Sequence, residues 1–208
     1  MNPFLTASEI IDWQHPAVRQ QAERLAVPGD PIRTARACFE FVRDQVKHSR
    51  DFEMDPATCR ASDVLLHGAG YCYAKSHLLA ALLRANGLPA GMCYQRLSVD
   101  DSGPPYCLHG YSAVELPGLG WYRMDARGNK PGVDAQFDPP HERLAFPLQS
   151  EEEYDFENIF PEPLPCVVKA LESADGWQTV LRTLPDLTPA EFASAGLKVR
   201  RQGGGRRP

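Results

Sequence analysis

The sequence predicts an α+β fold in which helices come first and an antiparallel sheet follows. Up to about residue 86, apolar residues recur at the three- and four-residue spacing of helices. Beyond Pro89, apolar and polar residues alternate instead, which is typical of strands. The turn residues at 117–120 then predict that two of these strands form a hairpin. We therefore expect an N-terminal helical part packed on an antiparallel sheet.

Length and composition indicate one main domain. The chain has 208 residues, of which 43% are hydrophobic and 24% are charged, as in ordinary globular proteins. We predict a domain over 1–150 with a core at about 33–130, a helical C-terminal extension over 151–198 packed on it, and a disordered Gly/Arg tail over 199–208. The net charge of −5 argues against a nucleic-acid partner, because phosphate binding needs a basic surface.

The N-terminal residues and the cysteines predict a location in the cytoplasm. Residues 1–10 lack a basic segment followed by a sustained apolar run, and no stretch is long and apolar enough to span a membrane. The six cysteines have no Cys-x-x-Cys spacing. We expect them to be reduced, which would keep a reactive thiol available.

The helices are expected in the following order. Thr6 or Ser8 would cap a short first helix, which His15-Pro16 would end. Residues 17–26 favour a second helix, and the apolar stripe of residues 32–46 predicts an amphipathic third. A polar connection and a single capped turn at 61–66 would then lead to the most apolar helix.

That apolar helix is predicted to run from about residue 72 to about residue 86. Gly68 and Gly70 precede it, Gly87 favours a left-handed C-terminal cap, and Pro89 prevents continuation. Cys72 would stand in its first turn. There, unpaired backbone N–H groups and the positive end of the helix dipole favour a thiolate over a thiol. We therefore interpret Cys72 as a candidate nucleophile.

Three strands are predicted after this helix. They cover residues 90–98, 108–116 and 121–126, and the last two would form the hairpin. Glycines and prolines argue against regular structure between 128 and 140. The acidic residues 151–157 are typical of a solvated surface segment. One or two helices between 165 and 184, and a helix start near Thr188, would complete the chain.

The hairpin carries the two partners that a thiol nucleophile needs. A base takes the proton of the thiol, and an acidic group orients the base. His109 lies near the start of one hairpin strand, and Asp125 lies near the end of the other. Because the turn at 117–120 reverses the chain, both side chains are expected to lie close together across the antiparallel pair.

With these residues in place, the chain resembles the transglutaminase-like superfamily, cysteine enzymes of papain-like fold. The resemblance covers about residues 33–130. It consists of a Gly-x-Cys helix start, the run LLAALLRANGLPA, a His-Gly-Tyr strand and a Trp-Tyr-x-x-Asp strand. It implies that Cys72 is the nucleophile, that His109 is the general base and then acid, and that Asp125 orients His109. Many members continue Asp-Pro or Asp-x-Thr, whereas residues 126–129 here read Ala-Arg-Gly-Asn, so a different substrate groove is expected.

The chemistry that the resemblance implies is acyl transfer through a thioester. The substrate would be an amide of a peptide or protein, and neither a cofactor nor a metal is required. Water as the acceptor gives a protease or amidase, and an amine gives a transglutaminase-type crosslinker. The backbone N–H of Cys72 would meet the oxyanion, with a second donor that the sequence does not identify.

Three other interpretations stay open at this stage. A transglutaminase-like scaffold without turnover would bind a peptide or protein partner. Arylamine acetyltransferases use the same Cys, His, Asp order, but residues 70–74 lack the Arg-Gly-Gly approach associated with them. Cys72, Cys107 and His109 could hold zinc, although they lack a paired ligand motif.

Overall fold

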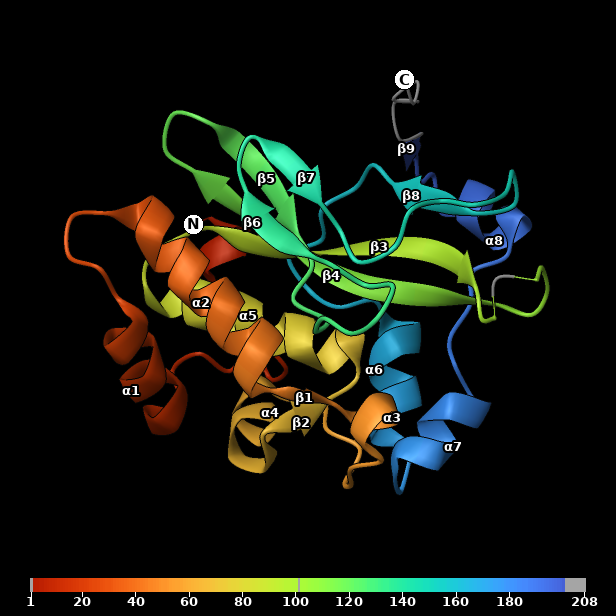
Figure 1. The fold of residues 1–208 in the computed structure, drawn as a ribbon, viewed down its shortest axis with the longest axis horizontal. Coiled ribbons are helices and arrows are strands. Elements are labelled where there is room, and N and C mark those ends of the chain that lie inside the picture. The colour runs from red at the N-terminus through yellow and green to blue at the C-terminus, as the bar shows by residue number, and fades with distance from the viewer. Residues whose placement is uncertain (1, 101, 201–208) are drawn as a thin grey trace.

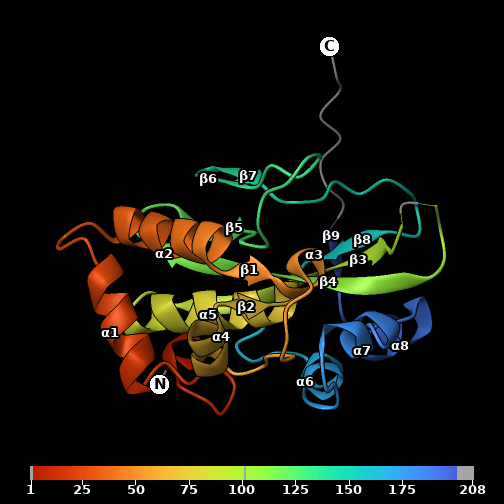
Figure 2. The same cartoon turned by 60° about the horizontal axis from the view of Figure 1, so that its bottom comes forward.

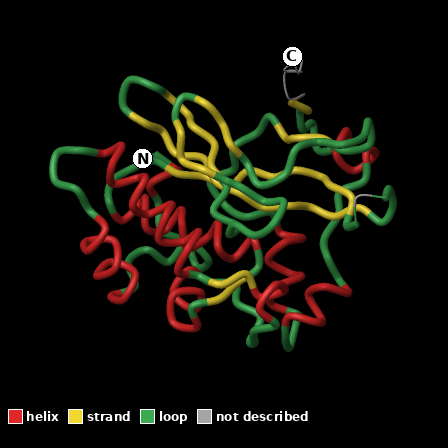
Figure 3. The backbone as a smooth tube through the Cα atoms, viewed as in Figure 1, coloured by secondary structure: helices red, strands yellow, loops and turns green. Residues whose placement is uncertain are grey.

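The computed structural model describes residues 2–100 and 102–200, and within them it shows a mixed α+β fold (Figure 1). A five-stranded antiparallel sheet has the strand order β5-β4-β3-β8-β9. Helix α5 lies between this sheet and helix α4 (Figure 2). Figure 3 shows most helices on one side of the long strands, whereas the short pair β1 and β2 lies among the helices. The predicted α+β class is confirmed.

The helices, including one short 3₁₀ helix, have these bounds: η1 Pro3–Leu5, α1 Pro16–Leu25, α2 Pro31–Gln45, α3 Ser49–Phe52, α4 Ala61–His67, α5 Cys72–Ala85, α6 Pro165–Glu172, α7 Trp177–Arg182 and α8 Pro189–Ser194. The strands have these bounds: β1 Lys47–His48, β2 Ala69–Gly70, β3 Ala90–Ser98, β4 Tyr106–Leu116, β5 Gly120–Met124, β6 Gln136–Asp138, β7 His141–Arg143, β8 Tyr154–Phe156 and β9 Val199–Arg200.

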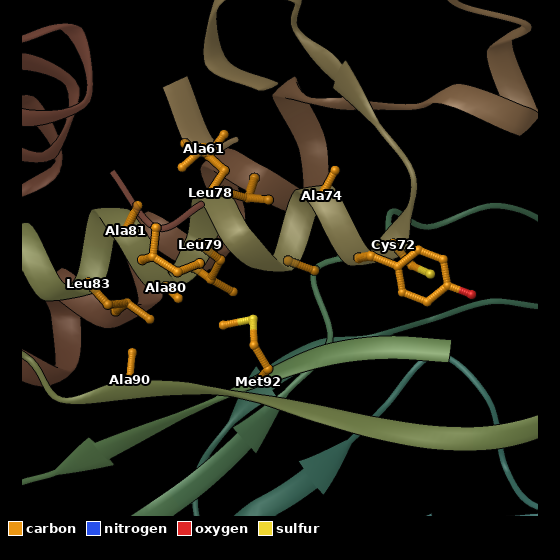
Figure 4. Close-up of a cluster of buried hydrophobic side chains, with 14 of the residues drawn as sticks. Ala61, Cys72, Ala74, Leu78, Leu79, Ala80, Ala81, Leu83, Ala90 and Met92 are labelled. Carbon is orange, nitrogen blue, oxygen red and sulfur yellow. The ribbon is translucent and has the colours of Figure 1, made fainter. Parts of the chain in front are cut away.

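Helix α5 is the centre of the hydrophobic core. Every residue from Cys72 to Arg84 is buried, so the helix has no solvent face. Figure 4 shows Ala90 and Met92 of β3 on one side of α5 and Ala61 of α4 on the other. Each leucine that the helix buries completely contributes roughly 1.5–3 kcal/mol to the free energy of unfolding. The core therefore fixes α5 firmly against the sheet.

The helix expected after Thr6 is wrong. Residues 6–12 form irregular structure with a bend at 9–11, because nearby side chains satisfy backbone groups that a helix would otherwise pair. The Ser8 hydroxyl accepts the backbone N–H of Ile11 at 3.1 Å. Asp12 accepts the backbone N–H of Ser62 at 3.0 Å, which caps the beginning of α4 from a distant part of the sequence.

The acidic surface segment expected at 151–157 is also wrong in its centre. Strand β8 is buried and pairs with β3 through Gln95 and Asp155. The extension over 151–198 is therefore helical only in part, since one of its segments belongs to the main sheet. Hairpin β6–β7 likewise forms where no regular structure was expected.

The disordered tail expected over 199–208 is wrong at its first two residues. Val199 and Arg200 form strand β9, which pairs with Phe156 and Asp155 of β8. The other residues of that predicted tail, 201–208, lie outside the described residues. Among the described helices, none combines the length and the apolar character that crossing a bilayer demands.

Candidate active site

Cys72 is the first residue of α5, as predicted, and a tight connection leads into it. Gly68 ends α4 in the left-handed conformation, with φ of 63°. Strand β2 then pairs with β1 in parallel, which places Gly70 beside His48. A Cβ atom on Gly70 would lie 3.0 Å from the Ala74 side chain, so the absence of a side chain lets the chain enter the helix closely. Cys72 is 7% exposed.

His109 and Asp125 lie together, which confirms the proximity predicted from the hairpin. His109 Nε2 is 2.7 Å from Asp125 Oδ2. Both side chains are buried, at 5% and 0% exposed. Asp125 also accepts two backbone N–H groups, from Arg127 and from Ala145, each at 3.1 Å. These contacts hold the carboxylate in one orientation beside the imidazole.

The charges at the site favour a protonated His109. Burial alone would lower the pKa of His109, but the charges of Asp125 and Cys72, together with hydrogen bonds to both, raise it to about 10. Burial would raise the pKa of Asp125, yet the charge and hydrogen bond of His109 lower it. Because Nε2 serves Asp125, Nδ1 remains for the Cys72 thiol. The arrangement suits a protonated imidazole that lies between the Asp125 carboxylate and the Cys72 side chain.

A close packing contact brings the start of α5 to strand β4. Gly110 follows His109, and a Cβ atom on Gly110 would lie 2.8 Å from the Tyr73 ring and 3.2 Å from Tyr73 Cα. The Tyr73 hydroxyl also donates a hydrogen bond to the carbonyl oxygen of Leu108. The residues that follow Cys72 and His109 in the chain therefore contact each other directly. The His-Gly-Tyr pattern has a steric explanation here.

The C-terminal segment 177–185 forms hydrogen bonds both to the start of α5 and to β4. The Tyr71 hydroxyl donates to the carbonyl oxygen of Trp177 at 2.7 Å. The backbone N–H of Leu108 donates to the carbonyl oxygen of Pro185 at 2.7 Å. Tyr71 precedes Cys72 and Leu108 precedes His109, so this segment contacts the residue before each. The sequence left the role of residues 150–198 open, and this is the contact they make with the site.

Cys72 and His109 line a cleft of about 530 Å³, large enough for a small peptide segment. Its walls come from the α5 start, the ends of β3 and β4, and the loops 127–133 and 146–153. The apolar part includes Leu97, Val99 and Leu184. The charged and polar part includes side chains that the sequence did not single out, chiefly His48, Arg50 and Arg127.

Asp51 connects several of these charged groups. Arg127 donates to both of its oxygens, and Lys130 donates to Oδ1 at 2.8 Å. Burial would raise the pKa of Asp51, but the hydrogen bonds and charges of these two cations hold it well below its usual range. Asp51 and Arg127 are 76 residues apart in the chain, which is why no local pattern in the sequence indicated the pair.

His48 faces the cleft as a neutral imidazole. Burial, followed by the positive charge of Arg127, lowers its pKa well below the ordinary value. Its Nδ1 is buried without a hydrogen-bond partner among the described residues and lies 3.7 Å from Asp51 Oδ2. Its register opposite Gly70 places it beside the N-terminus of α5. No sequence signal distinguished this histidine from an ordinary loop residue.

Within residues 2–100 and 102–200, no three His, Cys, Asp or Glu side chains are arranged to hold a metal ion. This includes the set Cys72, Cys107 and His109 considered from the sequence.

Comparison with known proteins places this site in a family. The family model described as "Transglutaminase-like superfamily" matches residues 19–126, which include all of Cys72, His109 and Asp125. The chain therefore belongs to the transglutaminase-like superfamily. The search of curated proteins returned no match.

Two of the solved structures that match this chain come from Cytophaga hutchinsonii and Pseudomonas aeruginosa. One is a candidate cysteine protease from Cytophaga hutchinsonii, with 21% identity, a TM-score of 0.47, and coverage of 60% of this chain and 41% of that chain. Another is the periplasmic domain of TgpA from Pseudomonas aeruginosa, with 23% identity, a TM-score of 0.44, and coverage of 59% and 45%. The chain thus matches less than half the length of each.

Proposed function

We propose that this protein is a cysteine-dependent enzyme that transfers the acyl group of a peptide or protein amide through a thioester on Cys72. The observation that supports this most strongly is the Cys72, His109 and Asp125 arrangement, placed at a helix N-terminus inside a cleft. Membership of the transglutaminase-like superfamily agrees with such chemistry. The same residues and geometry would serve hydrolysis or amine transfer, and the acceptor decides between them.

The proposed reaction begins with a thiolate on Cys72 and a protonated His109. The thiolate attacks the amide carbonyl, and the oxygen of the tetrahedral intermediate becomes an anion. The backbone N–H of Cys72 is free of helical pairing because it lies in the first turn, so it can donate to that oxyanion. His109 then gives its proton to the leaving amine, and Asp125 keeps the imidazole oriented throughout.

Deacylation uses the same groups in reverse roles. After the amine leaves, neutral His109 accepts a proton from water or from a second amine, which attacks the thioester. The products are a free acid or a new amide, and Cys72 returns to its starting form. No cofactor takes part in these steps. The cytoplasmic location inferred from the sequence stays a prediction.

His48 is our candidate for the second oxyanion donor. It lines the cleft with Cys72, lies beside the α5 N-terminus, and is kept neutral by burial and by Arg127. A neutral imidazole can donate one N–H without competing with His109 for the thiolate. Removing one oxyanion donor typically lowers the acyl-transfer rate by about 100-fold to 1,000-fold.

The experiment uses p-nitrophenyl acetate as an acyl donor and follows p-nitrophenol release and the mass of the Cys72 peptide. We expect a burst with one acetyl group on Cys72 in the wild type and none in Cys72→Ala. His48→Ala should slow acylation but leave alkylation by iodoacetamide unchanged, because alkylation develops no oxyanion. If Cys72 is never acylated while the fold is intact, the alternative function, a scaffold that binds a peptide or protein partner without turnover, replaces the proposal.

The acceptor is identified in the same assay. Adding a primary amine such as methylamine should give an N-methylacetamide product if the enzyme transfers to amines. If free acetate alone forms at all amine concentrations, the enzyme is a hydrolase. Absence of acetyl transfer from acetyl-CoA would separate it from the arylamine acetyltransferases.

A further inference from the structure

One wall of the cleft carries an excess of positive charge. It is formed by α3 and the loop 127–133 and presents Arg50, Arg127 and Lys130 to the space that Cys72 lines. The whole chain has the opposite sign, with a net charge of −5. Because this wall is positive and lies beside a candidate nucleophile, it can attract an anionic group of a substrate.

The carboxylates nearby do not neutralise this wall. Asp51 alone pairs with both Arg127 and Lys130, so that group of three keeps a net positive charge. Glu153 also lines the cleft, but its two carboxylate oxygens accept the backbone N–H groups of Ser98 and Gln149. The Glu153 carboxylate is therefore hydrogen-bonded to backbone groups of the other wall and does not pair with the cations.

Arg50 is the cation that remains available. Its side chain is exposed, and among the described residues it has no ion-pair partner. It lines the cleft together with Tyr71 and Cys107. Burial raises the pKa of Tyr71 and of Cys107 to about 12, and the Arg50 charge opposes both shifts. Tyr71 directly precedes Cys72, and Arg50 lines the same cleft as both.

We propose that Arg50, supported by Lys130, forms a carboxylate-binding subsite beside Cys72, so that the preferred substrate is an amide with an anionic group close to the bond that is cleaved. This inference rests on the proposed function of Cys72. A guanidinium with five N–H donors can bind a carboxylate through two parallel hydrogen bonds, which adds orientation to charge attraction. The apolar wall around Leu97 and Leu184 would contact the uncharged part of the substrate.

Two kinds of substrate carry this chemistry. One is a peptide whose free C-terminal carboxylate lies next to the cleaved amide, and the other is an internal peptide with an acidic side chain near that amide. Both place a carboxylate within a few bonds of the carbonyl carbon, so both can reach the cationic wall.

The test compares two alkylating probes of similar size and opposite charge state. Iodoacetate carries a carboxylate and iodoacetamide is neutral, and both form a thioether on Cys72 with loss of iodide. Second-order rate constants are measured for the wild type, Arg50→Gln and Lys130→Gln at low and moderate salt. Arg33→Gln is the matched control, because Arg33 is exposed on α2 and lines no part of the cleft.

We expect Arg50→Gln to lower the iodoacetate rate roughly threefold to tenfold, as for removing one partly screened unit charge from the wall of the cleft. The iodoacetamide rate should stay within about twofold, since this probe carries no charge and the Cys72 and His109 pair is retained. In the wild type, the ratio of the iodoacetate rate constant to the iodoacetamide rate constant should also fall as the salt concentration rises. Equal loss of both rates in Arg50→Gln, or no change in either, would overturn the subsite while leaving the reactivity of Cys72 established.

Failure of the proposed function gives a different result. In that case Cys72 reacts with both probes no faster than an ordinary thiol, in every variant. A second experiment distinguishes the two kinds of anionic substrate. It measures how well each of four peptides protects Cys72 from iodoacetamide: Ac-Ala-Ala, Ac-Ala-Ala-amide, Ac-Ala-Glu-amide and Ac-Ala-Gln-amide. Protection by the free acid indicates C-terminal carboxylates, protection by the glutamate peptide indicates acidic side chains, and equal effects of all four contradict the proposal.

Discussion

Gly110→Ala tests whether close packing of α5 on β4 sets the distance between Cys72 and His109. A Cβ atom on Gly110 would lie 2.8 Å from the Tyr73 ring and 3.2 Å from Tyr73 Cα, whereas ordinary contacts begin at 3.4 Å. Because Tyr73 Cα is backbone of α5, rotating the ring does not relieve the contact. Restoring 3.4 Å to Tyr73 Cα moves the start of α5 by about 0.2 Å, and the shift rises to about 0.6 Å where the buried ring cannot turn. Cys72 moves with the start of the helix.

This displacement should lower both the free energy of unfolding and the rate of Cys72 alkylation. Overpacking of this kind costs about 1–3 kcal/mol of unfolding free energy, so the melting temperature should fall by roughly 2–12 °C. A shift of about 1 Å between reacting groups can lower a rate by about 100-fold, so a smaller shift should lower it by roughly tenfold. Gly110 does not have a positive φ, and backbone strain therefore adds nothing to the effect.

The assay measures thermal unfolding and the rate of Cys72 alkylation by iodoacetamide at pH 6.5. Ser112→Ala is the control, because Ser112 lies two residues further along β4 and loses only a 3.4 Å hydrogen bond to the carbonyl oxygen of Ser76. We expect the control to behave like the wild type in both measurements. A Gly110→Ala protein that alkylates as fast as the wild type would refute the idea that this contact positions the thiol.

Three further predictions follow from the site. Cys72→Ala should abolish acylation and change the melting temperature by only a few degrees, since one small buried side chain replaces another; a variant that still forms the acyl product would contradict the role of Cys72. Tyr71→Phe should cost about 0.5–1.5 kcal/mol in unfolding free energy and slow Cys72 alkylation, because the hydrogen bond to Trp177 is lost; chemical denaturation and labelling rates measure both. Asp125→Asn removes the charge that raises the pKa of His109 from 6.5 to about 10. Protonated His109 stabilises the wild type fully below about pH 6.5, and this contribution is lost as the pH rises through 10, so the stability gap to Asp125→Asn should narrow between these values; a gap that widens with pH would show the opposite linkage.

The sequence predicted those parts of the fold in which local signals are strong. Helix α5 has glycines before it, a left-handed Gly87 after it and leucines and alanines at helical spacing within it, so its start at Cys72 could be predicted from the sequence alone. The hairpin turn likewise predicted that His109 and Asp125 would meet. Both predictions depend on residues that lie close in the chain.

Elements that depend on distant partners were missed. Strand β8 has three residues in an acidic stretch, and it is a strand because β3 and β9 pair with it on both sides. The Asp51 and Arg127 pair joins residues 76 positions apart, and Arg50 has its role only because α3 and loop 127–133 form one wall. Such contacts follow from tertiary packing, and no local pattern of residues encodes them.

The most direct test of a Cys72 thiol activated by His109 is the rate of Cys72 alkylation as a function of pH. It is measured with peptide mapping in the wild type and in His109→Ala. Four other cysteines are suitable internal references, because burial raises the pKa of Cys38, Cys59, Cys93 and Cys107 to about 12. We predict fast labelling of Cys72 well below pH 8.5, the value of an ordinary thiol at about 25 °C, and its loss in His109→Ala. Slow labelling of Cys72 that matches the other cysteines and does not depend on His109 would contradict the account.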